Sequence, residues 1–213
     1  MPSVSILYEV KVVIRDFELY KISRDFSLEY GTILGIIWFI TFFTCVNGLV
    51  GGNVLLMLIG MSFMGITALM PIYLAWRYKQ HLKAGERVPM SIAWLFVALM
   101  FFYAAVLTGV GEYLYFQYYD KGRVVEFFMR FLASPETEAQ YKTIGASDFL
   151  QQSREGLAEL ASLSPLDLTL NLFANNLFFS LLYSFPVALV AHRKCRDLKQ
   201  WANSLNNRNS NPS

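Results

Sequence analysis

The chain has 213 residues, of which 55% are hydrophobic and only 16% are charged. A soluble domain usually carries about 25% charged residues, so this composition favours an integral membrane protein. The formal net charge of +2 is too small to indicate a nucleic-acid partner.

Residues 1–28 precede the apolar runs and mix charged with apolar side chains. A helical stripe is formed by Leu7, Val10, Ile14 and Phe17. The run VSILYEVKVVI is also rich in β-branched residues, which favour a strand. We favour an amphipathic helix on the membrane surface, with a partly ordered extension as the alternative. Because no compact apolar signal region is seen here, insertion is expected to depend on the spans themselves.

Four apolar runs follow, each long enough to cross a bilayer as a helix. They cover residues 30–46, 54–75, 90–111 and 166–191. Only helices and closed barrels satisfy their backbone hydrogen bonds inside a membrane. We therefore predict an all-α membrane protein whose transmembrane domain, residues 29–194, contains four helices arranged as two hairpins.

Small residues and prolines occur at regular places in these spans. Small residues four positions apart let another helix approach closely, and an internal proline removes a backbone donor and kinks its helix. The packing and kink positions are Gly31, Gly35, Ala105, Gly109, Pro71 and Pro186. The segments PIYLAWRYK and PVALVAHRK, which end spans two and four, fit a parallel repeat of hairpins; chance and the general demand for basic anchors explain them as well.

Residues 120–165 form the one sizeable segment between spans. The stretch GRVVEFFMRFLASPETEAQYKT is typical of an amphipathic helix that is broken at Ser134-Pro135. A second helix is expected over 147–162, with Ser147 and Asp148 at its cap. Because the segment is too short for a large core of its own, we expect it to pack on the membrane or on a partner.

The distribution of basic residues indicates the orientation of the spans. Basic residues precede span one, join spans two and three, and follow span four, whereas the loop 47–53 has none. Both termini are therefore expected in the cytoplasm, and residues 120–165 on the far side of the membrane. The Asn- and Ser-rich tail, residues 195–213, is expected to be disordered.

The last span carries the strongest candidate site. Asp167, Asn171 and Asn175 are four residues apart, so they share a helical face that must meet protein or water rather than lipid. In the expected topology, Glu112 of the third span lies at the depth of Asp167. The candidate residues of a polar crevice for a lipid headgroup or small solute are Glu112, Asp167, Asn171, Asn175, Thr108 and Gln117. The interpretation that we favour for them is interhelical hydrogen bonding that only holds the bundle together; the crevice and a proton relay are the alternatives.

The sequence contains no motif that indicates catalysis. It has no phosphate-binding loop, zinc-protease motif, nucleophile elbow or acidic metal cluster, so no catalytic residue, metal or cofactor is predicted. The two cysteines, Cys45 and Cys195, are expected near opposite faces of the bilayer and do not form a disulfide in this interpretation. The sequence therefore does not favour an enzyme.

Three stretches carry a resemblance to a known family. They are YGTILGIIWFI, AWRYKQHLKAGERVPMSIAWLF and EYLYFQYYDKG. With the helical segment and the basic end of the last span, they resemble an uncharacterised family of four-helix bacterial inner-membrane proteins, a domain of unknown function. The resemblance covers about Glu29 to Lys194; the chain departs from the family at Gly85, where two glycines are usual, and in its longer N-terminal segment.

The resemblance implies a bacterial inner membrane and genes placed near membrane glycosyltransferases, but it transfers no catalytic residue. We therefore favour a non-enzymatic accessory or scaffold subunit of a cell-envelope assembly. Membrane lipids and either a membrane protein partner or a second copy are the expected partners. The competing hypothesis is a small transporter or lipid-binding protein that uses the outward-facing crevice between the third and fourth spans.

Overall fold

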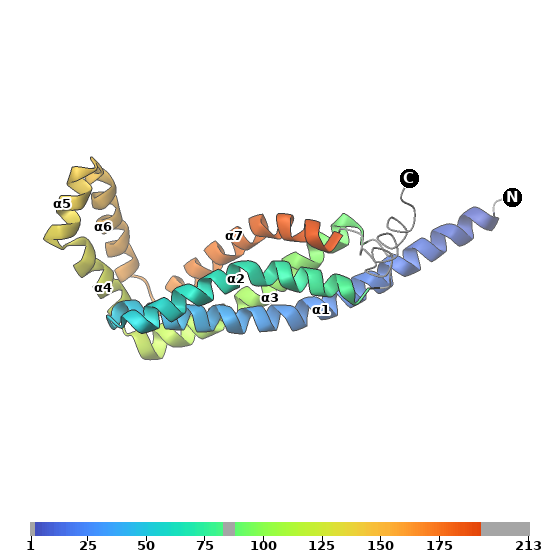
Figure 1. Ribbon diagram of the computed structural model, residues 1–213, viewed down its shortest axis with the longest axis horizontal. Coiled ribbons are helices and arrows are strands. Elements are labelled where there is room, and N and C mark those ends of the chain that lie inside the picture. The colour runs from blue at the N-terminus through green and yellow to red at the C-terminus, as the bar shows by residue number, and fades with distance from the viewer. Residues whose placement is uncertain (1–2, 83–87, 193–213) are drawn as a thin grey trace, which may run out of the picture. The chain divides into compact units, whose positions relative to one another are not determined.

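The computed structural model describes residues 3–82 and 88–192, with side chains from residue 14 onward (Figure 1). Within these residues the chain forms α-helices and one π-helix and no strand, which confirms the predicted all-α fold. The elements are α1 (Ser3–Val50), α2 (Val54–Gln80), α3 (Met90–Leu114), η1 (Tyr115–Asp120), α4 (Arg123–Leu132), α5 (Pro135–Thr143), α6 (Ser147–Ala161) and α7 (Pro165–His192). The predicted tail, 195–213, and Gly85 lie outside the described residues.

Four helices are long and apolar enough to cross a membrane, as predicted, and they indicate a multi-pass membrane protein. The candidate spans are Ile14–Val50, Val54–Gln80, Met90–Asp120 and Pro165–His192. All four helices extend beyond the predicted apolar runs, α7 by only one residue at each end. Hydropathy marks the part of a helix that suits lipid, whereas backbone hydrogen bonding continues the helix through charged and aromatic residues at its ends.

The N-terminal segment is helical, so the strand alternative for residues 3–26 is wrong. Helix α1 begins at Ser3 and continues through Val50 without an interruption at residue 28. Extending an existing helix adds one hydrogen bond for each residue that is ordered, whereas starting a new element is costly. The apolar span therefore supports a helix over residues whose local composition also suits a strand.

The chain divides into two compact units, and each long helix contributes to both. Unit 1 contains the described residues within Met1–Leu34, Ala68–Ala104 and Phe179–Ser213. Unit 2 contains Gly35–Thr67 and Ala105–Phe178.

Aromatic rings and small hydroxyl groups form the core of unit 1. The rings of Tyr78 and Phe96 stack with their centroids 4.0 Å apart, and Tyr30 meets Phe96 edge-on at 6.4 Å. Ser23 and Ser27 of α1 form hydrogen bonds with residues of this cluster on other helices. The Ser23 hydroxyl shares a 2.6 Å hydrogen bond with the Tyr78 hydroxyl, and the Ser27 hydroxyl donates to the Phe96 carbonyl at 2.9 Å.

A glycine and two long-range hydrogen bonds join further helices within unit 1. A Cβ atom added at Gly31 would lie 2.6 Å from the carbonyl oxygen of Met100, so α1 and α3 approach closely there. The Tyr183 hydroxyl of α7 donates to the Ala68 carbonyl at 2.8 Å. At the end of α7, His192 Nδ1 lies 2.7 Å from the Val88 carbonyl oxygen. All four long helices thus have specific partners in this unit.

Unit 2 brings α1 and α2 together at two glycines. A Cβ atom added at Gly60 would lie 2.6 Å from Cys45 Sγ, and one at Gly48 would lie 2.5 Å from the Met57 nitrogen. Small residues let the two backbones approach closely, which provides the packing that associates helices in lipid. The turn between these helices holds Gly52 at φ 63°, a left-handed conformation that glycine adopts without strain.

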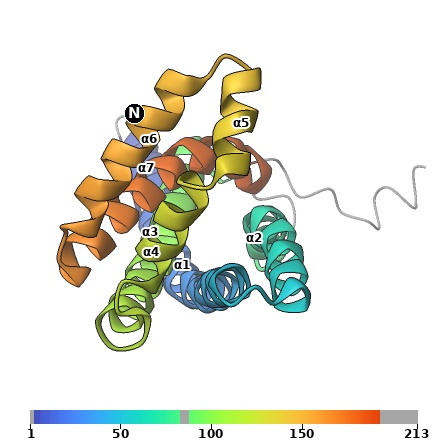
Figure 2. The same ribbon diagram turned by 90° about the vertical axis from the view of Figure 1, so that its left-hand side faces the viewer.

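Helices α4, α5 and α6 of unit 2 pack on one another, and we call them the short-helix segment (Figure 1, Figure 2). The break at Ser134-Pro135 is where predicted, since the Ser134 side chain caps α5 and Pro135 occupies its first turn. The guanidinium of Arg154 on α6 donates to the Leu132 carbonyl oxygen at 2.7 Å and 3.0 Å, so it satisfies the end of α4.

The predicted cap of α6 is wrong by one residue. Ala146 occupies the N-cap position and makes no side-chain cap hydrogen bond. Ser147 and Asp148 are the first two helical residues. An acidic side chain in the first turn still interacts favourably with the positive end of the helix dipole, so Asp148 supports the helix start without capping it.

Candidate functional site

The structure places the six predicted crevice residues in two different environments of unit 2. Glu112 and Thr108 of α3 are buried, with 3% and 2% of their surface exposed. Four are exposed: Gln117, Asp167, Asn171 and Asn175. Neither of the two pockets described for unit 2 includes any of the six. Their binding role stays a prediction.

Glu112 is the one buried acid of the predicted set. One turn earlier, the Thr108 hydroxyl donates to the Gly35 carbonyl of α1 at 3.2 Å. Glu112 Oε2 is buried without a hydrogen-bond partner among the described residues. A polar atom in that state is costly and rare in folded proteins, so this position is a candidate for a role beyond packing.

The polar row of α7 is exposed within a candidate span. Asp167 Oδ2 accepts a 2.6 Å hydrogen bond from the Ser164 hydroxyl at the start of the helix. The side chains of Asn171 and Asn175 show no such bond in the described structure and are exposed. An asparagine that faces lipid is unfavourable, because the hydrocarbon offers its amide no hydrogen bonds. We therefore expect the row to meet protein or water rather than lipid.

Helix α3 continues into η1, a π-helix that ends at a buried acid that sequence reasoning missed. The Asp120 carboxylate accepts hydrogen bonds from the backbone nitrogens of Gly122 at 3.0 Å and Val124 at 3.1 Å. The chain reverses here because Lys121 and Gly122 adopt left-handed backbone angles, with φ 50° and 85°. Asp120 thus caps α4, and the acid-Lys-Gly sequence is the signal that could have identified it.

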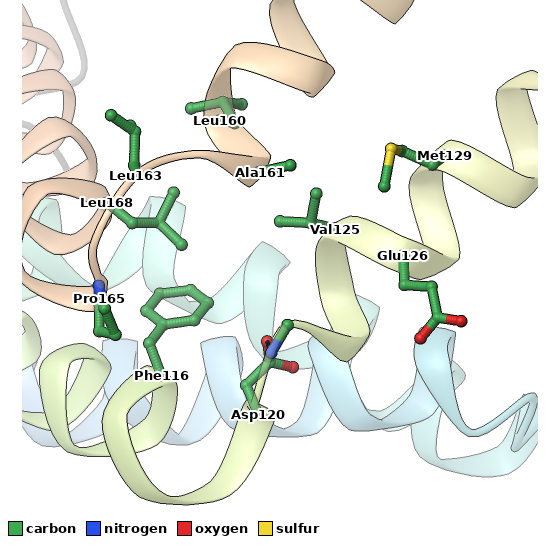
Figure 3. A pocket seen from close by; sticks show the side chains of 11 residues that line it. Phe116, Asp120, Val125, Glu126, Met129, Leu160, Ala161, Leu163, Pro165 and Leu168 are labelled. Carbon is green, nitrogen blue, oxygen red and sulfur yellow. Dashed lines mark hydrogen bonds between the residues drawn. The ribbon is translucent and has the colours of Figure 1, made fainter.

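A small pocket of about 160 Å³ lies where η1, α4, α6 and the start of α7 meet (Figure 3). Phe116, Val125, Leu160 and Leu168 give it an apolar lining. Of its two acidic residues, Asp120 caps α4 and Glu126 forms an exposed ion pair with Arg130 at 3.2 Å. The pocket lies in the packing between these helices, and its lining residues do not form an arrangement that indicates catalysis.

Comparison with known proteins assigns the chain to a family. The family described as "Protein of unknown function (DUF4199)" matches residues 29–193, and the chain belongs to it. This confirms the predicted resemblance to a domain of unknown function. Neither a curated protein nor a solved structure matches the chain.

Proposed function

We propose that this DUF4199 protein is a non-enzymatic accessory or scaffold subunit of a cell-envelope assembly in the bacterial inner membrane. In this proposal the exposed polar row of α7 is its docking face for a partner transmembrane helix. The observation that carries the proposal is the exposure of Asn171 and Asn175 within a candidate span.

The physical reason is that polar side chains associate helices in lipid. Amide groups hydrogen-bond across helix interfaces, and small neighbours let the helices approach. Ala174 lies between the two asparagines and is also exposed, so the face offers both features. A partner helix with amide or hydroxyl groups at matching depth would pair with this row. A second copy of the chain meets that requirement, as does another membrane protein.

The proposed orientation has both termini in the cytoplasm and residues 120–165 on the far side, with the spans as two hairpins. The basic residues at both ends of the sequence support it. A cysteine at Gln140, which is exposed on α5, tests it. Labelling of Gln140→Cys by an impermeant maleimide added to intact spheroplasts supports the orientation. Labelling only after the membrane is opened contradicts it.

Site-specific photocrosslinking in native membranes tests the docking face. A photoreactive amino acid replaces Asn171 in one variant, and in the control it replaces Phe185, an apolar α7 residue that is 59% exposed. We expect a discrete protein adduct at position 171 and none at 185. The mass of the adduct distinguishes a second copy from another protein, and equal crosslinking at both positions contradicts the proposal.

The competing proposal, a small transporter or lipid-binding protein, is supported by one observation. Glu112 Oε2 is buried and unpartnered among the described residues, as expected of a group reserved for a ligand or a proton. Co-purified lipid without a protein partner, lost in Glu112→Gln, supports this alternative. A Glu112→Gln variant that changes only thermal stability supports a structural role.

A further inference from the structure

A second hollow in unit 2, of about 780 Å³, lies beside the turn that joins α1 to α2. Residues from the end of α1, the start of α2, η1 and α4 line it, and we call it the arginine hollow. Its charged lining residues are Arg123 and Arg130, and no acidic residue is among those that line it. Its lining therefore carries two positive charges, and one of them is paired with Glu126.

The arginine hollow lies at the level where candidate spans end. Two spans end at Val50 and Asp120, and another begins at Val54. Val50 and Tyr119 both line the hollow. Lipid head groups occupy this boundary of the hydrocarbon core. An amphiphile in the membrane therefore presents its head, rather than its chain, to the two arginines.

Arg123 is held in place before any ligand binds. Its Nε donates to the Asp120 carbonyl oxygen and its Nη2 to the Tyr119 carbonyl oxygen, both at 3.2 Å. Its guanidinium carbon lies 4.9 Å from the centroid of the Tyr119 ring. A guanidinium has five N–H donors, so three remain for an anion. A fixed donor loses little conformational freedom on binding.

Arg130 is available because its present partner holds it weakly. Its ion pair with Glu126 spans 3.2 Å, but the two side chains are 74% and 61% exposed. Exposed pairs of this kind contribute little to stability. Arg130 follows Arg123 by seven residues on the same face of α4, about 10.5 Å along the helix axis. Both arginines line the hollow, so their long side chains reach the same phosphate-bearing head.

The remaining lining divides between apolar and amide groups. Val50, Leu56, Phe127 and Phe131 provide apolar surface. Asn53 accepts a hydrogen bond from the Leu56 nitrogen with its Oδ1 at 3.1 Å, and its Nδ2 forms no hydrogen bond among the described residues. Apolar surface beside two arginines and an amide donor matches a molecule with a charged head and an apolar chain.

We propose that the arginine hollow binds the phosphate-bearing head of an anionic membrane amphiphile. Arg123 and Arg130 contact the phosphate oxygens, and the apolar lining contacts the first part of the chain. This site uses none of the α7 residues of the docking face, so either proposal can fail without the other.

The test measures binding of fluorescent dioleoyl phosphatidic acid to the full-length chain in phosphatidylcholine nanodiscs. The double variant R123Q/R130Q is compared with R15Q/K142Q, which removes the same charge from exposed residues that do not line the hollow. We expect the double variant to bind phosphatidic acid about tenfold more weakly or worse, and the control to match the unsubstituted chain. The single variant R130Q, whose side chain is largely exposed, is expected to lose on the order of fivefold without unfolding.

Inorganic phosphate and phosphatidylcholine are the two comparison ligands. We expect inorganic phosphate at the same concentration to displace no lipid, and labelled phosphatidylcholine to bind without preference for the unsubstituted chain. Equal affinities for R123Q/R130Q and R15Q/K142Q would overturn the proposal. Displacement by inorganic phosphate would overturn the proposal by showing an ion site instead of an amphiphile site. Tight phosphatidylcholine binding would overturn it by showing that the net negative charge of the head is not recognised.

Discussion

Unit 1 and unit 2 differ in the hydrogen bonding of polar side chains within the candidate spans. In unit 1, hydroxyl groups form hydrogen bonds across helices, as in the pairs of Ser23 with Tyr78 and Tyr183 with Ala68. In unit 2, Glu112 Oε2 is buried without a partner among the described residues, and Asn171 is exposed on α7.

Each unit contains one exception to this difference. The Tyr30 hydroxyl of unit 1 is also buried without a hydrogen-bond partner in the described part of the chain. In unit 2, Thr108 does bond across helices, to Gly35. The difference still teaches where to look for function, because proteins tolerate unsatisfied polar groups mainly where binding requires them. Unit 1 holds its helices together, and we infer that unit 2 meets partners and lipids.

Among the predicted variants, the largest loss of stability is expected at a close contact between helices in unit 1. Gly31→Ala places a methyl group 2.6 Å from a backbone oxygen and should lower the free energy of unfolding by about 2 kcal/mol. Gly65→Ala is the control, because nothing lies within 4 Å of its added Cβ. That variant should gain up to about 1 kcal/mol from helix propensity. Denaturant unfolding in detergent measures both, and equal shifts would contradict the close approach of α1 and α3.

A smaller loss should follow from removing a hydrogen bond across helices in unit 1. Ser23→Ala deletes the 2.6 Å bond to the Tyr78 hydroxyl and should cost about 1 kcal/mol. Ser62→Ala removes an exposed hydroxyl that bonds only within α2, to the Leu58 carbonyl, and should cost nearly nothing. The same unfolding assay compares the two. If Ser62→Ala costs as much as Ser23→Ala, the bond across helices does not stabilise unit 1.

The smallest effect is expected in unit 2, and it has the opposite sign. Asn171→Leu with Asn175→Leu replaces two weak helix formers by two strong ones on an exposed face. The free energy of unfolding of the single chain in detergent should therefore rise by up to about 1 kcal/mol. The expected gain follows because neither amide contributes a hydrogen bond to the protomer in the described structure. Thermal unfolding measures it. A clear loss of stability would show that the row serves the protomer itself.

Much of the helical fold could be predicted because its signals are local. Apolar runs predicted the four spans, and Ser134-Pro135 predicted the end of α4 and the start of α5. The continuity of α1 past residue 28 could not be read from composition, since the span propagates the helix. The π-helix η1 was missed as well, because no hydropathy pattern marks an i to i+5 hydrogen-bonded turn.

The candidate site was harder to predict than the spans. Spacing placed Asp167, Asn171 and Asn175 on one face of α7, but it could not tell which neighbour that face meets. Glu112 and Asn171 have different environments because the rotation of each helix depends on packing across the whole bundle. The two arginines of α4 were not predicted as site residues, because only the fold brings them beside the turn between α1 and α2.

Partner recovery from native membranes tests whether the polar row of α7 is the docking face. The Asn171→Leu/Asn175→Leu variant is compared with Leu182→Ala/Phe185→Ala, which changes two exposed apolar residues of the same helix. We expect the asparagine variant to lose its co-purifying chain, whether a second copy or another protein, at unchanged expression. We expect the Leu182→Ala/Phe185→Ala variant to keep that chain. Retention of the same partner by the asparagine variant, with loss in the apolar variant, would contradict the claim that the polar row of unit 2 is the docking face.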